Sequence, residues 1–133
     1  MSNKKTFKRF AVIMIRNDQD DVLMGRRSDT NLYTNPGGGI EEGEDIFVGA
    51  AREVLEETGL YLKSIKLLGA DIIDKNKLIY TFEGFLSEDV EITAKPDPDE
   101  EVQEWSYYDL NDIKEELHIP VDKNLLIKYW CEN

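Results

Sequence analysis

The stretch that decides the fold is GGIEEGEDIFVGAAREVLEETGL, residues Gly38–Leu60. It begins as a glycine-rich acidic turn and continues with the apolar spacing of a short amphipathic helix. Asp45 suits the N-cap of that helix, because its carboxylate can accept hydrogen bonds from the free N–H groups of the first turn. Gly59 suits the C′ position, since glycine adopts the left-handed conformation that ends many helices. The stretch therefore predicts a turn followed by a helix.

The predicted helix has an apolar face and an acidic face when its residues are placed at about 100° intervals. The acidic face carries Glu53, Glu56 and Glu57, with Arg52 and Gly49 next to them. The apolar face, which we expect to be buried against a sheet, consists of Phe47, Ala50, Ala51, Val54 and Leu55.

The charges on the acidic face are unfavourable for an isolated helix. Glu53 and Glu57 form a like-charge i,i+4 pair, which costs about 0.2–0.5 kcal/mol when exposed. With Glu56 they approach the helix C-terminus, where each anion costs about 0.3–1 kcal/mol. A hard divalent cation such as Mg²⁺ or Mn²⁺ would reverse both effects, because it prefers carboxylate oxygens. A solvated acidic face is the alternative, and the charges alone leave both open.

Composition limits the partners of this chain. Its 133 residues suit one domain, residues 1–133, and carry a net charge of −12. This charge argues against an extended nucleic-acid surface, which needs clustered Lys and Arg. A polyphosphate can still bind if metal ions lie between the two anions. Without a signal peptide or an apolar run of about 20 residues, we expect a cytoplasmic protein with no membrane partner.

The rest of the chain reads as mixed strands and helices. Phe10–Ile15 is an uninterrupted apolar run, which predicts a strand covered on both faces. After the polar turn Asn17–Asp21, Val22–Met24 reads as the returning strand of a hairpin. Further expected strands are Ile65–Ile73, Leu78–Leu86 and Val102–Tyr108. Helical spacing is found at Leu110, Ile113 and Leu117, and again after Pro120 at Leu125, Leu126, Tyr129 and Trp130. This order predicts a single domain of the α/β (α+β) class, built as a sandwich.

The fixed spacing within Gly38–Leu60 resembles the signature of the Nudix hydrolase family. That signature is a glycine, five residues, a glutamate, seven residues, and then Arg-Glu-apolar-x-Glu-Glu-x-Gly-apolar. All of its defined positions are matched here, by Gly38, Glu44, Arg52, Glu53, Val54, Glu56, Glu57, Gly59 and Leu60. The resemblance implies the family's α/β/α sandwich with a mixed β-sheet.

The resemblance also implies roles for these residues. In similar proteins the glutamates matching Glu53, Glu56 and Glu57 bind Mg²⁺ or Mn²⁺, and we assign Gly38 to the same metal site. The arginine matching Arg52 orients these glutamates. The glutamate matching Glu44 supports the loop or the metal site.

The family places its general base on different elements in different members. Within the signature, Glu53 or Glu57 is close enough to deprotonate a water molecule. Outside it, the proline-broken acidic loop Ala94–Glu101 offers Glu100 and Glu101, which we favour over Glu104. The alternative for each of these outer carboxylates is a solvated loop side chain.

Substrate contacts are expected from a basic pair and from the glycines. Arg26 and Arg27 suit bidentate phosphate binding and stacking on a base, although they can also be a solubility pair on an edge strand. Gly37 and Gly39 allow a ligand to approach the backbone closely. Three aromatic residues are candidates for a base pocket but are better explained as core: Tyr33, Phe82 and Trp105.

The chemistry implied by the resemblance is attack of water on a nucleoside diphosphate linked to another group. Because the marks of several subfamilies are absent, the chain is most similar to MutT-like enzymes, which release a monophosphate and pyrophosphate from a (deoxy)nucleoside triphosphate. The alternatives are hydrolysis of ADP-ribose, a nucleotide sugar or a capped RNA 5′ end, and a non-catalytic nucleotide-binding module. The expected partner is a small nucleotide, bound by a monomer or a homodimer.

Overall fold

The computed structural model describes residues 7–86, 102–117 and 127–130, and it contains two β-sheets with helices on either side. One sheet has four strands in the order β4-β1-β6-β5, and the other has three in the order β3-β2-β7. Their bounds are β1 Lys8–Ile15, β2 Val22–Arg27, β3 Tyr33–Thr34, β4 Gly37–Gly39, β5 Leu62–Ile73, β6 Lys77–Leu86 and β7 Val102–Tyr108. The helices are α1 Ile46–Thr58, α2 Leu110–Ile113, the 3₁₀ turn η1 Lys114–Glu116, and a helical segment at 127–130.

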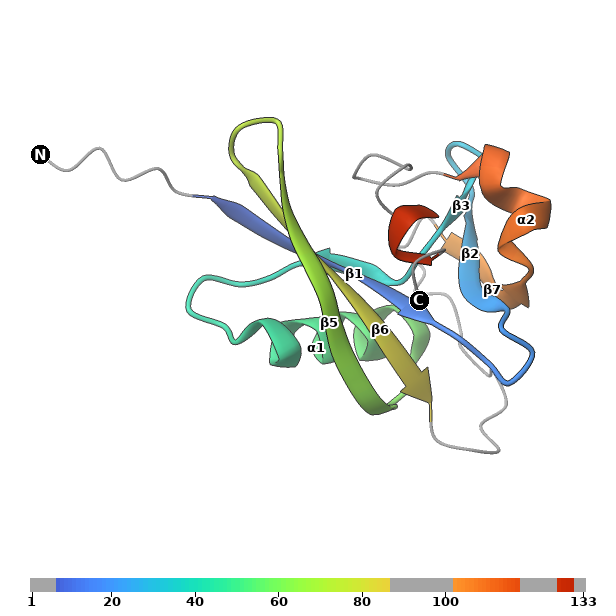
Figure 1. Ribbon diagram of the computed structural model, residues 1–133, viewed down its shortest axis with the longest axis horizontal. Coiled ribbons are helices and arrows are strands. Elements are labelled where there is room, and N and C mark those ends of the chain that lie inside the picture. Colours follow the sequence, from blue (N-terminus) through green and yellow to red (C-terminus); the bar gives the residue numbers. More distant parts are fainter. Residues whose placement is uncertain (1–6, 87–101, 118–126, 131–133) are drawn as a thin grey trace, which may run out of the picture.

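Strand β1 lies in the middle of the molecule and is covered on both faces, as its apolar run predicts. It pairs parallel with β6 and antiparallel with β4, so the four-stranded sheet is mixed. Alternate residues of β1 enter two separate cores. Ala11 and Ile13 pack on the side of α1, whereas Val12 and Met14 pack on the side of α2 and the 127–130 helix. Figure 1 shows α1 lying along the four-stranded sheet and α2 beside β2, β3 and β7.

The expected hairpin between the first two strands is wrong. Strand β2 belongs to the second sheet, where it pairs with β3 and β7. Among the described residues, the β-pairing across the turn consists of an isolated bridge between Arg16 and Val22. The physical reason is that both edges of β1 are already occupied by β4 and β6, so the turn carries the chain from one sheet to the other.

Helix α1 begins and ends where the sequence predicts. Asp45 accepts hydrogen bonds from the backbone nitrogens of Phe47 and Val48, at 3.2 and 3.3 Å. Gly59 has a φ of 73° and donates its N–H to the carbonyl of Leu55.

The buried face of α1 differs from the expected one. The residues that it buries are Gly49, Ala50, Val54 and Thr58. Ala51 is exposed, and Phe47 and Leu55 are 40% and 37% exposed. The helix meets β1 and β4 along a narrow stripe centred on Ala50 and Val54, so the larger apolar side chains lie at its margins. Phe47 keeps one core contact there, with its ring centroid 5.5 Å from that of Phe82.

The remaining elements agree with the sequence patterns. The expected strands Ile65–Ile73, Leu78–Leu86 and Val102–Tyr108 are present as β5, which begins three residues earlier, β6 and β7. Trp105 and Phe82 are core residues. Leu110, Ile113 and Leu117 are buried together, although the helix that carries them is short and ends as a 3₁₀ turn. Pro120, Leu125 and Leu126 lie outside the described residues. Among the described residues, no helix has the length and apolar character needed to cross a membrane.

Candidate active site

Arg52 is the centre of a polar cluster between α1 and the loop that precedes it. An arginine side chain has five N–H donors, and here each has an acceptor. Nε and Nη2 donate to the Glu44 carboxylate at 2.8 and 3.0 Å, and Nη2 also donates to the Gly39 carbonyl at 3.0 Å. Nη1 donates to Glu53 and Glu56 at 3.1 and 3.0 Å. The guanidinium group is therefore held by all of its donors, and it connects Glu44 of the loop to Glu53 and Glu56 of the helix.

Glu44 holds Arg52 from the loop side. Its carboxylate also accepts the Glu41 N–H at 3.0 Å. The hydrogen bonds from Arg52 and Glu41 lower the pKa of the Glu44 carboxyl to about 2, so the group stays charged near neutral pH. The expected supporting role of Glu44 remains a prediction, but its geometry suits that role.

Gly49 explains how Glu44 reaches Arg52. A Cβ at position 49 would lie 2.8 Å from Glu44 Oε1 and 3.2 Å from Ile40 Cγ2. Glycine inside a helix costs about 1 kcal/mol relative to alanine. We attribute its presence in α1 to the space that the Glu44 side chain occupies.

Two glycines of β4 lie beside the carboxylates of Glu57 and Glu53. The Gly37 N–H donates to Glu57 Oε1 at 2.9 Å. A Cβ on Gly38 would lie 2.5 Å from Glu53 Oε2, so the glycine leaves the space that this carboxylate fills. A Cβ on Gly39 would meet no atom within 4 Å, so this position has no such steric requirement. Two of the three glycines thus set the positions of candidate metal ligands.

The carboxylate oxygens of this cluster suit a hard cation such as Mg²⁺ or Mn²⁺, which prefers oxygen ligands. Glu53 and Glu56 both accept hydrogen bonds from Nη1 of Arg52. Glu57 accepts one from the N–H of Gly37, the residue before Gly38. Within the described part of the chain, however, no three acidic, histidine or cysteine side chains are gathered closely enough to hold an ion together. Binding through all three glutamates requires side-chain rotation, which is easiest for Glu56, whose side chain is 57% exposed.

Burial distinguishes Glu53 from Glu56. The Glu53 side chain is 13% exposed, and this burial raises the pKa of its carboxyl above the usual value, against the opposing attraction of Arg52. The hydrogen bond to Glu44 in the first place, and then the hydrogen bond to Glu56 and the charge of Glu53, raise the pKa of the Arg52 guanidinium. The arginine therefore remains a cation at any pH at which the protein is folded.

The basic pair lies at the end of β2, in a separate pocket of about 320 Å³ that also contains Ser28, Asn31 and Glu104. Arg27 donates two hydrogen bonds to Asp29, at 2.9 and 2.8 Å, a pairing that sequence reasoning missed. Arg26 lies opposite Glu104 on β7, and its guanidinium carbon is 5.9 Å from the centre of the Tyr33 ring. The polar lining is compatible with a phosphate or a nucleotide, and the substrate contacts remain a prediction.

The candidate bases outside the signature are only partly described. Glu100 and Glu101 lie outside the described residues. Glu104, which was the less favoured candidate, is exposed on β7 and lies in the pocket of the basic pair.

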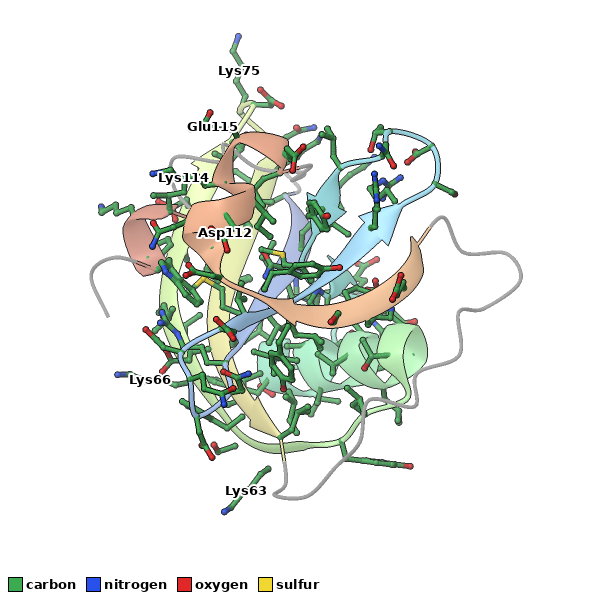
Figure 2. All side chains as sticks on the ribbon, turned by 90° about the vertical axis from the view of Figure 1, so that its right-hand side faces the viewer. Lys63, Lys66, Lys75, Asp112, Lys114 and Glu115 are labelled. Carbon is green, nitrogen blue, oxygen red and sulfur yellow. The ribbon has the colours of Figure 1, made fainter. Side chains whose placement is uncertain are left out.

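In Figure 2, the labelled cations Lys63, Lys66 and Lys75 extend outward from β5 and from the turn after it. None of these three lysines therefore comes from α1, which carries Glu53, Glu56 and Glu57.

A comparison with protein families identifies the chain. The NUDIX domain matches residues 5–129. The chain belongs to the NUDIX family. Membership confirms the resemblance found in Gly38–Leu60 and the expected Nudix fold of mixed α/β architecture.

Two curated relatives are similar to this chain over the region of the signature. The RNA pyrophosphohydrolase of Wolbachia pipientis subsp. Culex pipiens (strain wPip) is 38% identical over 60 residues, which cover 44% of this chain and 37% of the relative. The putative 8-oxo-dGTP diphosphatase of Bacillus subtilis (strain 168) is 39% identical over 49 residues, covering 37% of this chain and 33% of the relative. The matches thus span about a third of the length of these relatives.

One solved structure is similar over the whole chain. The MutT protein from Methanosarcina mazei Go1 has a TM-score of 0.70 at 25% identity, and the similarity covers 99% of both chains.

Proposed function

We propose that this NUDIX protein is a Mg²⁺- or Mn²⁺-dependent pyrophosphohydrolase acting on a nucleoside diphosphate linked to another moiety. The observation that carries the proposal is the Arg52 cluster. It holds Glu53, whose carboxylate lies beside Gly38, together with Glu56, within a complete family signature.

The chain's own residues orient the reacting groups. A bound divalent cation would neutralise the charge that develops on the phosphate oxygens. Arg52 holds the carboxylates of Glu53 and Glu56, and the Gly37 N–H holds that of Glu57. The proton of the attacking water molecule passes to one of the candidate bases, which are Glu53, Glu57, Glu100 and Glu101.

The preferred substrate is a (deoxy)nucleoside triphosphate, cleaved to a monophosphate and pyrophosphate. Support comes from the whole-length likeness to a MutT protein and from the relative named as a putative 8-oxo-dGTP diphosphatase. Arg26 and Arg27 are the candidate contacts to the nucleotide, through the polar pocket at the end of β2. The expectations of a cytoplasmic location and of a monomer or homodimer stay predictions.

Pyrophosphate removal from an RNA 5′ end is the second candidate. It is favoured by the relative named as an RNA pyrophosphohydrolase. The net charge of −12 opposes extended contacts with RNA, so such an activity would recognise the 5′ end alone.

The test is a product assay with Mg²⁺ and with Mn²⁺ over nucleoside triphosphates, ADP-ribose, nucleotide sugars and 5′-triphosphorylated or capped RNA. We expect a nucleoside monophosphate and pyrophosphate from a triphosphate. Glu56→Gln should lower turnover at least about tenfold. Glu116→Gln, the same change on the exposed 3₁₀ turn η1, is the matched control. Turnover of no substrate by the natural sequence would instead support the non-catalytic nucleotide-binding module.

A further inference from the structure

Arg9 lies outside the family signature but contacts the loop that leads into it. Residues alternate along β1, so Arg9 shares a face with Ala11 and Ile13, on the side of α1. Its backbone carbonyl accepts the Ile40 N–H at 2.9 Å. Its side-chain Nη2 donates to the Glu41 carbonyl at 2.7 Å and to the Glu44 carbonyl at 3.1 Å. One residue of β1 therefore binds the loop at three points.

The turn that Arg9 holds is acidic, and its carboxylates repel one another. Glu41, Glu42 and Glu44 lie within four residues, and the turn is closed by one backbone hydrogen bond, from the Glu44 N–H to the Glu41 carbonyl at 3.0 Å. Arg9 adds a charge-assisted donor to that same carbonyl. Such hydrogen bonds are about twice as strong as neutral ones.

The position of this turn decides where the Glu44 carboxylate lies. That carboxylate binds Arg52 through two hydrogen bonds, and Arg52 in turn binds Glu53 and Glu56. A turn displaced by 1 Å would break the short contacts between Glu44 and Arg52, because hydrogen bonds weaken steeply with distance and angle. A continuous set of hydrogen bonds thus connects Arg9 to two candidate metal ligands.

We propose that Arg9 is a positioning residue for the metal-binding carboxylates: it fixes the turn Glu41–Glu44, so that Glu44 holds Arg52 in the orientation that presents Glu53 and Glu56. The inference rests on the proposed function, since it concerns the same site. The Arg9 side chain donates to the backbone carbonyls of Glu41 and Glu44, so it acts on Glu53 and Glu56 through Glu44 and Arg52.

The experiment compares Arg9→Met with Lys8→Met. Both substitutions remove one positive charge from the start of β1, but Lys8 is exposed and alternates to the other face of the strand. Three readouts are needed: Mn²⁺ affinity by calorimetry without substrate, amide hydrogen exchange of the segment 40–45 without metal, and kcat and KM.

In Arg9→Met we expect Mn²⁺ affinity and kcat to fall about tenfold, as for other groups that orient metal ligands. The segment 40–45 should exchange faster, and KM for the nucleotide should change little. Arg9→Lys should recover most of the Mn²⁺ affinity, because an ammonium group can donate to both carbonyls. Lys8→Met should match the natural sequence in all three readouts.

Equal Mn²⁺ affinity and equal exchange in Arg9→Met and Lys8→Met would overturn the inference. If Arg9→Met does not fold, Arg9→Gln and Lys8→Gln replace the pair, with the same expected difference. If the natural sequence neither binds Mn²⁺ nor hydrolyses any nucleotide, the proposed function fails and the positioning role falls with it. Metal binding and hydrolysis that are insensitive to Arg9 would remove the positioning role alone.

Discussion

Two arginine-centred clusters lie on opposite sides of the sheets, and they use the same side chain differently. On the side of α1, Arg52 donates to three carboxylates and one carbonyl. On the other side, Arg16 donates to Asp20 at 2.9 Å and to the Trp130 carbonyl at 3.2 Å, and its guanidinium carbon lies 3.8 Å from the centre of the Trp130 ring. Arg16 Nε is also 2.9 Å from Glu83, although its N–H is not aligned with that oxygen, so this contact is electrostatic.

The burial of the arginine and the kind of partner separate the roles of the two clusters. The Arg16 side chain is 7% exposed and Glu83 is 14% exposed, and a backbone carbonyl and an indole ring complete the contacts. Arg52 instead holds Glu56, which is 57% exposed and can reach a ligand. Arg16 thus ties the 127–130 helix to the sheet, whereas Arg52 gathers three carboxylates from α1 and its preceding loop. Because Asp20, a partner of Arg16, is 74% exposed, one exposed carboxylate on an arginine is no evidence of a site. The gathering of several carboxylates on one guanidinium distinguishes the Arg52 cluster.

The largest effect on activity is expected from Arg52→Lys. Lysine keeps the charge but lacks the rigid planar fork, so it cannot hold Glu44, Glu53 and Glu56 together. We expect kcat to fall about 100-fold, at the upper end for groups that orient metal ligands. Steady-state kinetics with Mg²⁺ measure the loss, and a thermal unfolding curve confirms folding. A kcat within twofold of the natural sequence would show that these carboxylates need no oriented support.

The same substitution in the other cluster, Arg16→Lys, should affect stability and not turnover. It removes the stacking on Trp130 and the hydrogen bond to its carbonyl. The expected loss is about 2 kcal/mol in the free energy of unfolding, measured by urea denaturation. Reduced kcat at a temperature where the variant is fully folded would contradict the division of roles.

Smaller perturbations are available at Gly38, beside the Arg52 cluster, and at Gly69, beside the 127–130 helix that Arg16 contacts. In Gly38→Ala the new methyl group displaces the Glu53 carboxylate, and we expect kcat to fall about tenfold with little change in stability. Gly39→Ala, with open space at its Cβ, is the control for folding. Gly69→Ala instead pushes on Tyr129 and should lower the thermal midpoint without changing kcat. The reverse pattern in Gly38→Ala and Gly69→Ala would overturn the comparison.

The smallest effect is a pH dependence from Glu44. Its pKa is about 2 in the folded protein, against an ordinary value of 4.5. A lowered folded pKa contributes stability above the unfolded pKa, and this contribution is lost as pH falls. Between pH 5 and pH 2, the natural sequence should therefore lose stability relative to Glu44→Gln. Parallel stability curves for the two proteins would show that the Glu44 pKa is not lowered by folding.

Sequence periodicity predicted the elements better than it predicted their partners. The caps at Asp45 and Gly59 were predictable because they depend on local backbone geometry. The pairing of β2 was not, since an antiparallel return and a crossing to a second sheet begin with the same polar turn. The exposure of Phe47 and Leu55 was also unpredictable, because helix periodicity gives the direction of the apolar face but not the width of the contact.

By itself, the sequence determined the family, the ends of α1 and the placing of Glu53, Glu56 and Glu57 near the end of that helix, because all of these depend on residues at fixed short spacing. Helix spacing also placed Arg52 beside them, whereas only the tertiary structure decided which other groups surround those glutamates. Three contacts join segments between 8 and 35 residues apart: Gly38 lies beside Glu53, Glu44 binds Arg52, and Arg9 binds the turn Glu41–Glu44. Contacts of this kind depend on strand pairing and on the docking of α1, so no local pattern encodes them.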